Sequence, residues 1–306
     1  MKGLVLKTTG SFYELRDDAG KKYTAVLRGK HKIAGLKVTN PIAVGDYVDF
    51  ELEEREQKGV INKILDRENY IIRNSTHKAE HGHIIAANID QAVLVATVSH
   101  PKTSLGFIDR FLVTCESYRI PCIVVLNKWD IQKQEDEELG LAIAYIYKSI
   151  GYEVVFTSSV TGEGIETLRG KLSGLKTLFA GHSGVGKSTL LNQIDANLHL
   201  KTGEISDFSQ KGVHTTTFAE MFEIAADTFI IDTPGIKELG INEIEEHELG
   251  HYFPEFRALM HGCKFNNCRH LNEPSCAVIK ALEQGRIHQT RYESYLSILE
   301  NEDNRR

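Results

Sequence analysis

The sequence lacks long apolar runs and is poor in cysteine. None of its 306 residues belongs to an apolar run of about 18 residues, the length that a membrane-spanning helix requires. The apolar part of residues 1–7 is too short for a signal peptide. We therefore expect a cytoplasmic protein with no membrane partner. Its five cysteines are not expected to form disulfides in a reducing compartment.

The sequence also lacks an excess of positive charge. Its formal net charge of −6 argues against a uniformly basic nucleic-acid-binding protein. It does not exclude a local basic patch, because affinity for phosphates depends on the local arrangement of Lys and Arg. The length permits about two or three domains with a sizeable core.

The N-terminal part contains short runs typical of β-strands, at residues 4–8, 12–16, 23–27, 47–52 and 60–65. Turn residues separate these runs. Five short strands over residues 1–68 predict a small barrel. An OB-fold is the favoured type, with an SH3-like barrel as the alternative.

Basic residues are concentrated in residues 16–37 of this part, with an interleaved tyrosine and histidine. That composition suits contact with RNA phosphates and bases. A solvated surface explains the charge equally well. The basic residues are Arg16, Lys21, Lys22, Arg28, Lys30, Lys32 and Lys37.

Residues 181–188 form a complete G-x-x-x-x-G-K-[ST] motif. The motif follows an apolar run and precedes a segment with helical periodicity, which is the context of a phosphate-binding loop. Its glycines let backbone N–H groups converge on a β-phosphate, Lys187 bridges the β- and γ-phosphates, and the Ser188 hydroxyl ligates Mg²⁺. A chance glycine-rich turn is the alternative. The predicted nucleotide-binding residues here are Gly181, His182, Ser183, Gly184, Val185, Gly186, Lys187, Ser188 and Thr189.

Residues 127–130 read N-K-x-D and follow the apolar run 122–126. The carboxylate of Asp130 can accept hydrogen bonds from both the N1–H and the exocyclic amine of guanine, neither of which adenine has. Asn127 can either support the loop or meet N7 of the base, and the stem of Lys128 can lie over the ring. Together with the phosphate loop, this motif predicts GTP and GDP as ligands.

Two further strand-like runs end in residues suited to the same nucleotide. The first run ends in Thr157-Ser158-Ser159, which can offer backbone N–H groups to guanine O6. In the sequence D-T-P-G, Asp232 can hold Mg²⁺ through water and the N–H of Gly235 can meet the γ-phosphate.

The polar segment 206–217 has the composition of a switch loop, and Thr216 is the threonine we predict to complete the Mg²⁺ shell with Ser188 and Asp232. Ras-like enzymes position the attacking water with a glutamine after the Asp-x-x-Gly motif, a place that Ile236 occupies here. His214 is the nearest candidate for that task, although it can also be an ordinary loop residue. The predicted catalytic residues are His214, Lys187 and Thr216.

Strands and helices alternate through residues 69–240, which predicts an α/β fold with a mainly parallel, doubly wound sheet. One predicted helical stripe consists of Leu139, Ile143, Ile146 and Ile150. The base-reading motif precedes the phosphate loop, whereas the order is reversed in ordinary small GTPases. We therefore predict a circularly permuted GTPase domain over residues 69–240, with a linker at 69–87.

The C-terminal part, residues 241–306, brings three cysteines and one histidine together within a short stretch. Three thiolates and one imidazole suit tetrahedral Zn²⁺ and leave no position open for a catalytic water, so the predicted role is structural. The predicted ligands are Cys263, Cys268, His270 and Cys276.

The segments flanking the cluster look helical. Several of their basic residues could touch RNA, although a solvated helix surface explains them as well. These residues are Lys280, Arg286, His288, Arg291, Arg305 and Arg306.

The small barrel, the permuted motif order and the Cys/His cluster together resemble the bacterial small-ribosomal-subunit-dependent GTPase A family, over nearly the whole chain. The resemblance implies a GTPase that acts late in maturation of the small (30S) subunit, is stimulated by that subunit, and contacts rRNA through both flanking domains. It also implies that His214 is the catalytic histidine and Thr216 the switch threonine. We expect a monomer with one structural Zn²⁺ and with Mg²⁺ bound alongside GTP.

The sequence leaves two other functions open. The first is a nucleotide-gated module that binds RNA or protein and whose hydrolysis is incidental. The second is a P-loop ATPase, against which Asp130 argues.

Overall fold

The computed structural model describes residues 1–28, 40–53, 58–74, 82–200, 219–232 and 244–300. The chain forms two compact units. One contains Met1–Val93, Ile165–Ser183 and Lys187–Leu239, and the other contains Leu94–Gly164, Gly184–Gly186 and Gly240–Arg306. No helix among the described residues has the length and apolar character needed to cross a membrane.

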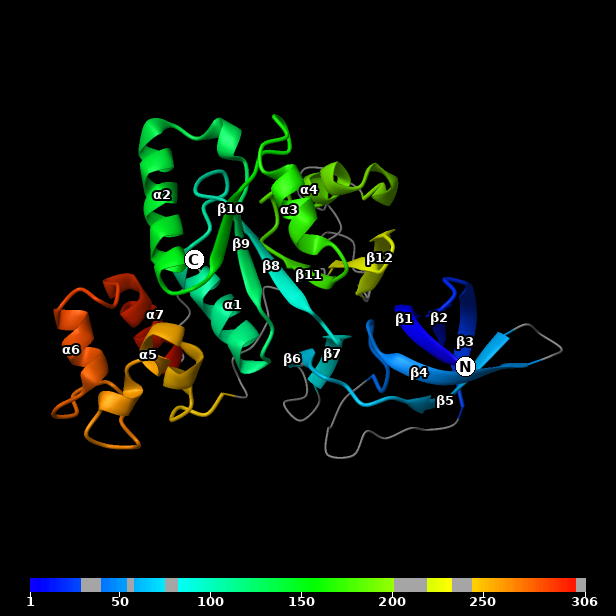
Figure 1. Ribbon diagram of the computed structural model, residues 1–306, viewed down its shortest axis with the longest axis horizontal. Helices are drawn as coiled ribbons and strands as arrows, with labels where there is room; N and C mark the ends of the chain where they lie inside the picture. Colours follow the sequence, from blue (N-terminus) through cyan, green and yellow to red (C-terminus); the bar gives the residue numbers. More distant parts are fainter. Residues whose placement is uncertain (29–39, 54–57, 75–81, 201–218, 233–243, 301–306) are drawn as a thin grey trace, which may run out of the picture. The chain divides into compact units, whose positions relative to one another are not determined.

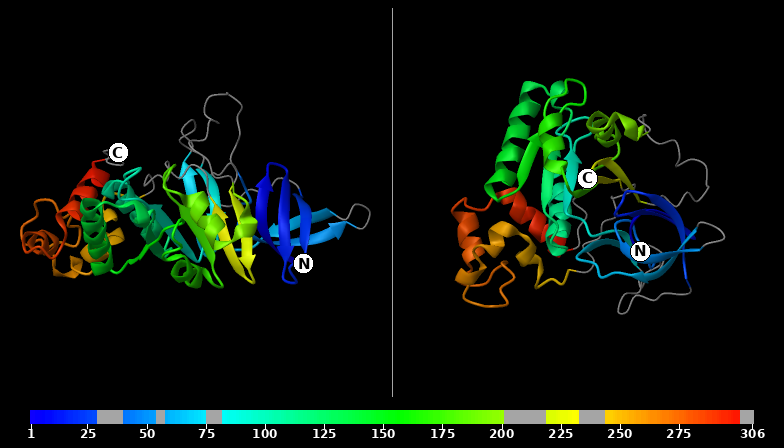
Figure 2. Two further views of the ribbon diagram at one scale, coloured as in Figure 1. Left: turned by 90° about the horizontal axis from the view of Figure 1, so that it is seen from above. Right: turned by 45° about the vertical axis from the view of Figure 1, so that its right-hand side comes forward.

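The N-terminal strands of the first unit close into a barrel, which the right-hand view of Figure 2 shows as a ring of blue strands. Neighbouring strands pair in the order β1-β2-β3-β5-β4, and β4 returns to pair with β1. All pairs are antiparallel except β3 with β5. This closed barrel confirms the OB-like prediction. The strands are β1 (Lys2–Thr9), β2 (Phe12–Asp17), β3 (Lys22–Leu27), β4 (Tyr47–Glu53) and β5 (Lys58–Ile64).

Alternating residues of these strands fill the barrel, as the period of a strand requires. Val5, Leu15, Ala25, Val48 and Phe50 are among the residues that form its core. A two-stranded hairpin follows the barrel, formed by β6 (Tyr70–Asn74) and β7 (Gly82–Ala87).

The turn before β4 depends on Gly45. Its φ of +88° favours glycine, and a Cβ there would lie 2.0 Å from the carbonyl oxygen of Ala87. Next to it, the carboxylate of Asp46 accepts two hydrogen bonds of 2.6 Å from the Arg67 guanidinium. The barrel is thereby joined to the segment that leads into the hairpin.

The first unit also contains the strands that lead to and from the phosphate loop. β11 (Lys176–Ala180) is parallel to β13 (Thr228–Asp232), which is antiparallel to β12 (Glu220–Ala225). β12 in turn pairs with β1 of the barrel at Lys7 and Glu220. The helices among the described residues of this unit are α3 (Ile165–Leu172), α4 (Lys187–Ile194) and the short 3₁₀ helix η2 (Ala196–Leu198).

The second unit begins within β8 (Gln91–Ala96) and contains a parallel pair formed by β9 (Cys122–Leu126) and β10 (Glu153–Phe156). Buried Val, Ile and Leu side chains fill β8 and β9, as expected for strands covered on both faces. Two long helices accompany these strands, α1 (Leu105–Ser117) and α2 (Gln134–Ser149). The Ser104 side chain caps α1 by accepting a hydrogen bond from the N–H of Phe107.

The predicted apolar stripe of α2 is partly wrong. Ile143 and Ile146 are buried, but Leu139 is 40 % exposed and Gly140 lies inside instead. The buried face is thus rotated by one residue from the position that hydrophobicity alone predicts.

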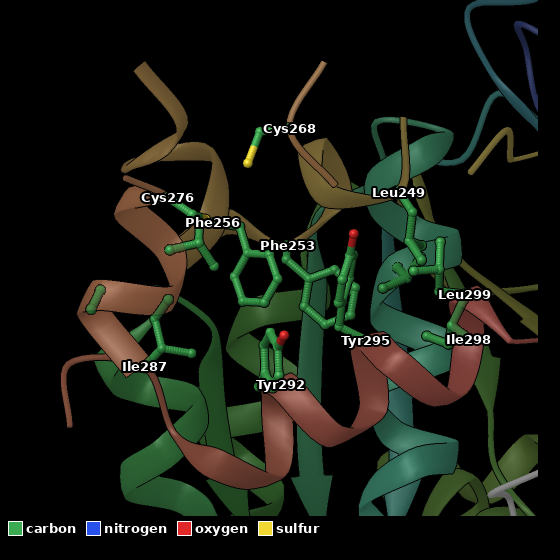
Figure 3. Close-up of a cluster of buried hydrophobic side chains, with 13 residues drawn as sticks. Leu249, Phe253, Phe256, Cys268, Cys276, Ile287, Tyr292, Tyr295, Ile298 and Leu299 are labelled. Carbon is green, nitrogen blue, oxygen red and sulfur yellow. The ribbon is translucent and has the colours of Figure 1, made fainter. Parts of the chain in front are cut away.

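The C-terminal segments of the second unit are short helices that pack around a cluster of aromatic side chains (Figures 1 and 3). Tyr292 and Tyr295 extend from one face of α7 toward Phe253 and Phe256. Val113 of α1 belongs to the same apolar cluster, so this core is shared with the helix that follows β8. The helices are η5 (Leu249–Tyr252), α5 (Pro254–Arg257), η6 (Met260–Gly262), α6 (Ala277–Glu283) and α7 (Gln289–Leu299).

Candidate functional site

Asn127, the first residue of the predicted base-reading motif, joins three segments of the second unit. Its backbone N–H donates to the carbonyl of Ala96 at the end of β8. Its side-chain Nδ2 donates to the carbonyl oxygen of Val185 at 2.8 Å, and its Oδ1 accepts from Thr157 Oγ1 at 2.9 Å. Asn127 is 2 % exposed. Of the two roles predicted for it, the structure favours support of the loop over contact with a base.

Thr157 was predicted only for its backbone N–H, and the role of its side chain was not predicted. It lies directly after β10, beside Ser158, and its buried hydroxyl orients the Asn127 amide. Its place in the sequence Thr157-Ser158-Ser159 at a strand end was the available signal.

Asp130 is exposed at the start of the short 3₁₀ helix η1 (Trp129–Ile131). Its Oδ1 accepts a hydrogen bond of 2.5 Å from Ser158 Oγ. The same Ser158 oxygen accepts from the backbone N–H groups of Val160 and Thr161. These bonds fix the direction of the carboxylate that we expect to read the base.

Two other predicted residues lie in the same region. Lys128 adopts a left-handed conformation, with φ of +59°, and its ammonium donates to the carbonyl of His100. The hydroxyl of Ser159 is buried and has no hydrogen-bond partner among the described residues.

The middle of the phosphate loop, residues 184–186, belongs to the same compact unit. A Cβ at Gly186 would lie 2.7 Å from Asn127 Nδ2, and its φ of +87° also favours glycine. Val185 is fully buried. Only glycine at position 186 therefore lets the loop pass this close to Asn127.

In the first unit, the ends of the phosphate loop follow β11 and begin α4. Gly181, His182 and Ser183 come directly after the strand, and Lys187, Ser188 and Thr189 form the first turn of the helix. This is the strand, loop and helix arrangement predicted for the motif.

The Lys187 ammonium forms an ion pair with the carboxylate of Asp232. Asp232 ends β13 and is the register partner of Phe179 in the parallel neighbour β11. Parallel strands present their carboxyl ends at one edge, so Asp232 lies at the edge where the phosphate loop begins. The two charged groups that the sequence predicts for phosphate and Mg²⁺ are thus brought together.

Three predicted residues of the nucleotide site lie outside the described residues: His214, Thr216 and Gly235. Five of the basic residues offered for RNA contact lie outside them as well: Lys30, Lys32, Lys37, Arg305 and Arg306.

The predicted metal ligands do converge. One ligand atom from each of Cys263, Cys268, His270 and Cys276 lies within 4.8 Å of all the others. His270 Nδ1 is 3.7 Å from Cys263 Sγ and 3.4 Å from Cys276 Sγ. A tetrahedral Zn²⁺ with bonds of about 2.3 Å to sulfur separates its ligand atoms by about 3.8 Å. The residues present therefore fit such an ion.

The pKa values of the four predicted ligands decide how metal binding depends on pH. Burial lowers the pKa of His270, which keeps the imidazole neutral, as a ligand must be. Burial raises the pKa of the Cys268 thiol to about 12 and also raises the pKa of Cys276. Metal binding must then release protons from these thiols, so affinity for the metal should rise with pH.

The surrounding side chains hold the backbone of the cluster in place, among them two tyrosines of the aromatic core that is drawn in Figure 3. Tyr292 Oη donates to the carbonyl of His270 and Tyr295 Oη donates to the carbonyl of Arg269, at 2.8 and 2.6 Å. The carboxylate of Glu273 accepts from the N–H groups of Arg269 and Leu271. The cluster is therefore integrated into the aromatic core.

Two basic residues that sequence analysis offered for RNA contact are engaged within the protein. Arg16 makes two hydrogen bonds, of 2.9 and 2.8 Å, to the carboxylate of Glu223. Arg291 is 1 % exposed and is bound by the carboxylates of Asp109 and Glu255. The prediction that Arg291 touches RNA is wrong, because a buried guanidinium offers no surface. Lys21, Lys22 and Arg28 are exposed and remain candidates.

Comparison with known proteins identifies similarities over the full chain. The RsgA GTPase family matches residues 64–242, and the RsgA N-terminal domain family matches residues 2–61. The chain is 50 % identical over 307 residues to the small ribosomal subunit biogenesis GTPase RsgA of Cytophaga hutchinsonii, covering all of both chains. It is 48 % identical over 303 residues to the protein of that name from Bacteroides fragilis, covering 99 % of this chain and 97 % of the relative.

Two solved structures are also similar. YjeQ from Thermotoga maritima matches with a TM-score of 0.80 and 35 % identity, covering 100 % of this chain and 99 % of that one. YloQ, described as a circularly permuted GTPase, matches with a TM-score of 0.74 and 30 % identity, covering 100 % and 96 % of the two chains. These matches and the barrel confirm the predicted α/β fold with a permuted order of motifs.

Proposed function

Because the chain belongs to the RsgA GTPase family and is a GTP hydrolase, we propose that it converts GTP to GDP and phosphate during late maturation of the small ribosomal subunit. The observation that carries the nucleotide assignment is the hydrogen bond from Asn127 Nδ2 to the carbonyl of Val185. Through it, the loop that carries Asp130 contacts the loop whose sequence binds phosphates. One guanine nucleotide can then engage both motifs.

Each motif residue has a defined task in this proposal. Asp130 accepts the N1–H and the 2-amino group of guanine, and its direction is set by Ser158. Of the predicted N–H groups, that of Ser159 is the one that faces guanine O6, because the backbone N–H groups of Thr157 and Ser158 donate to the carbonyls of Leu126 and Glu163. Backbone N–H groups of the phosphate loop, from Gly181 to Thr189, surround the β-phosphate, and the ammonium of Lys187 lies between the β- and γ-phosphates.

Ser188, Thr216 and Asp232 are the residues that would hold Mg²⁺. The bound ion would supply neutralisation of the charge that develops on the transferred phosphoryl group. Lys187 and Asp232 form an ion pair with each other here, so Lys187 would have to leave it to bind phosphate, and Asp232 would then be free to hold the ion through water. The N–H of Gly235 completes the γ-phosphate contacts.

His214 is proposed to hold the attacking water in line with the γ-phosphate. Support comes from the sequence, in which Ile236 cannot hydrogen-bond to water. The variant His214→Ala should lower turnover while leaving affinity for GDP within about twofold of the wild type. Unchanged turnover would remove His214 from the mechanism.

The assignment to ribosome maturation is supported by the names of the relatives, which describe biogenesis of the small ribosomal subunit.

We propose that the chain is a cytoplasmic monomer divided into a barrel (1–68), a GTPase domain (69–240) and a metal-binding domain (241–306). The two flanking domains contact rRNA, and the exposed Lys21, Lys22 and Arg28 are candidate contacts on the barrel.

The decisive experiment measures GTP turnover alone and with purified small subunits, large subunits or bulk RNA. We expect stimulation by small subunits only. Equal stimulation by any RNA, or none, would favour the alternative of a nucleotide-gated binding module whose hydrolysis is incidental.

The metal of the Cys/His cluster is proposed to be a structural Zn²⁺. The convergence of three sulfurs and one imidazole nitrogen supports it. Metal analysis should find one zinc per chain, and Cys276→Ser should lose it. Cys115→Ser is the control, because Cys115 is buried in α1 and is not part of the cluster.

A further inference from the structure

Trp129, the only tryptophan of the chain, occupies the variable place of the N-K-x-D motif. Its backbone N–H donates to the carbonyl of Thr157 at 3.0 Å. Its ring packs against Phe156, with 4.3 Å between the ring centroids and 44° between the planes. One face of the indole is therefore supported by the end of β10.

The far edge of the indole fills the space beside Gly140 of α2. A Cβ at position 140 would lie 2.6 Å from Cζ3 and 2.9 Å from Cη2 of Trp129, and 3.1 Å from Val98 Cγ2. These distances are shorter than van der Waals contact allows. The ring thus lies where every other residue type at position 140 would place its side chain.

Gly140 lies inside a helix of 16 residues, where glycine costs about 1 kcal/mol relative to alanine. The contact with Trp129 gives a steric reason for this cost. Gly170 of α3 provides a contrast, because a Cβ there would meet nothing within 4 Å.

The packing of Trp129 bears directly on Asp130, the next residue along η1. Asp130 itself is exposed, and Lys128 before it has a left-handed backbone that a lysine adopts at a cost. The loop must therefore be held by its neighbours. The half-buried indole, which packs between Phe156 and Gly140, is the largest apolar group that the motif itself contributes.

We propose that Gly140 and Trp129 form a matched pair that positions Asp130 and thereby sets selectivity for guanine. Gly140 touches no nucleotide in this proposal and acts through Trp129, so it is a positioning residue. The inference rests on the proposed guanine nucleotide site.

The test is the variant Gly140→Ala, with Gly170→Ala as the matched control. Affinities are measured for GDP, for IDP, which lacks the 2-amino group, and for ADP. A displaced Asp130 loses the contact with the 2-amino group of guanine. Gly140→Ala should therefore weaken the binding of GDP about tenfold and the binding of IDP by less, so that the ratio of the GDP affinity to the IDP affinity falls. Gly170→Ala should leave both affinities and their ratio unchanged.

A second substitution separates this mechanism from a general loss of structure. Trp129→Phe removes Cζ3 and Cη2, the atoms that a Cβ at position 140 would strike. In the Trp129→Phe background, Gly140→Ala should weaken the binding of GDP by less than about twofold. Such non-additivity is expected of two residues in contact.

The emission of Trp129 gives an independent readout. GDP should change it and ADP should not, and Gly140→Ala should shift the unliganded spectrum to longer wavelength as the ring loses its contact with Phe156. If Gly140→Ala does not fold, the GDP to IDP ratio of Trp129→Phe alone decides, and a ratio equal to the wild type would overturn the inference.

The failures are distinguishable. Wild-type affinity and selectivity in Gly140→Ala would refute the role of the pair while leaving the GTPase assignment intact. A wild-type protein that binds ADP as tightly as GDP would refute the proposed guanine site itself.

Discussion

The chain attaches its flanking regions to the nucleotide-binding strands and helices in two physically different ways. The barrel is joined to β12 through one paired position, Lys7 with Glu220, and through ion pairs that water reaches. The C-terminal helices are joined to α1 through a buried ion-pair network and a shared apolar core. Each attachment lies within one compact unit.

The buried network centres on Arg291 of α7, which lies beside α1 (Figure 1). Its guanidinium donates to Asp109 of α1 at 2.6 Å and to Glu255 of α5 at 2.7 Å. Tyr147 of α2 donates to the same Asp109 oxygen. Burial alone would lower the pKa of Arg291, but the two carboxylates outweigh it and hold that pKa well above its usual value.

The two attachments differ in the free energy that their separation costs. Separating α7 from α1 would expose their shared apolar core to water and part Arg291 from Asp109, which costs several kcal/mol. Separating the barrel from β12 would leave groups that water can solvate, at a far smaller cost. β12 also begins at Glu220, three residues after the end of segment 206–217, which the sequence assigns to the switch loop. The weak attachment is thus the one next to the segment expected to respond to nucleotide.

The largest predicted effect comes from breaking the buried network. Arg291→Met should lower the free energy of unfolding by about 3–5 kcal/mol, because it leaves Asp109 and Glu255 buried without their cation. Urea unfolding followed by the fluorescence of Trp129, which belongs to the same compact unit, measures it.

The matched control for this variant is Arg257→Met. Arg257 pairs with Glu116 of the same helix α1 at 2.9 Å, but their side chains are 51 % and 23 % exposed. Its loss should cost less than about 1 kcal/mol. Similar costs for the two variants would show that burial is not what distinguishes the attachments.

Site residues could be predicted from the sequence where they lie close together along the chain. The phosphate loop, the N-K-x-D motif and the Cys/His cluster each lie within a short stretch of chain, so spacing alone indicates their geometry. The barrel strands were also found, since turn residues delimit short apolar runs. The roles of His214, Thr216 and Gly235 remain predictions, because these residues lie outside the described part of the chain.

The same reasoning failed where the partner is distant in sequence. Arg291 and Asp109 are 182 positions apart, and an arginine between polar helix residues has the appearance of a surface residue. Arg16 and Glu223, separated by 207 positions, misled in the same way. Leu139 was placed inside α2 because hydrophobicity could not reveal that Trp129 requires a glycine at the neighbouring position. Long-range packing, which periodicity does not encode, decided each case.

An intermediate effect is predicted for Arg16 and Glu223, whose side chains are 15 % and 26 % exposed. The bidentate geometry strengthens this pair, while solvent weakens it. A double-mutant cycle with Arg16→Gln and Glu223→Gln should give a coupling of about 1 kcal/mol, measured by urea unfolding followed by far-UV circular dichroism. The guanidinium of Arg16 also lies over the ring of Phe229, 5.5 Å from its centroid, so the single arginine variant should cost more than the coupling alone. A coupling free energy of zero would show that the hydrogen bonds between Arg16 and Glu223 do not stabilise the attachment of the barrel.

The smallest effect is predicted for Lys7, whose ammonium is 2.9 Å from Glu220 with both side chains more than one third exposed. Lys7→Gln should cost no more than about 0.5 kcal/mol, and the difference should vanish in about 1 M salt, where the Debye length falls to about 3 Å. Lys7→Glu places like charges opposite each other across the β1–β12 pair and should cost slightly more, and Glu220→Lys should restore the loss. Urea unfolding at low and high salt distinguishes these outcomes. If Lys7→Gln cost as much as Arg291→Met at either salt concentration, exposure to water could not be the property that separates the two attachments, and the backbone pairing of β1 with β12 would have to account for the difference.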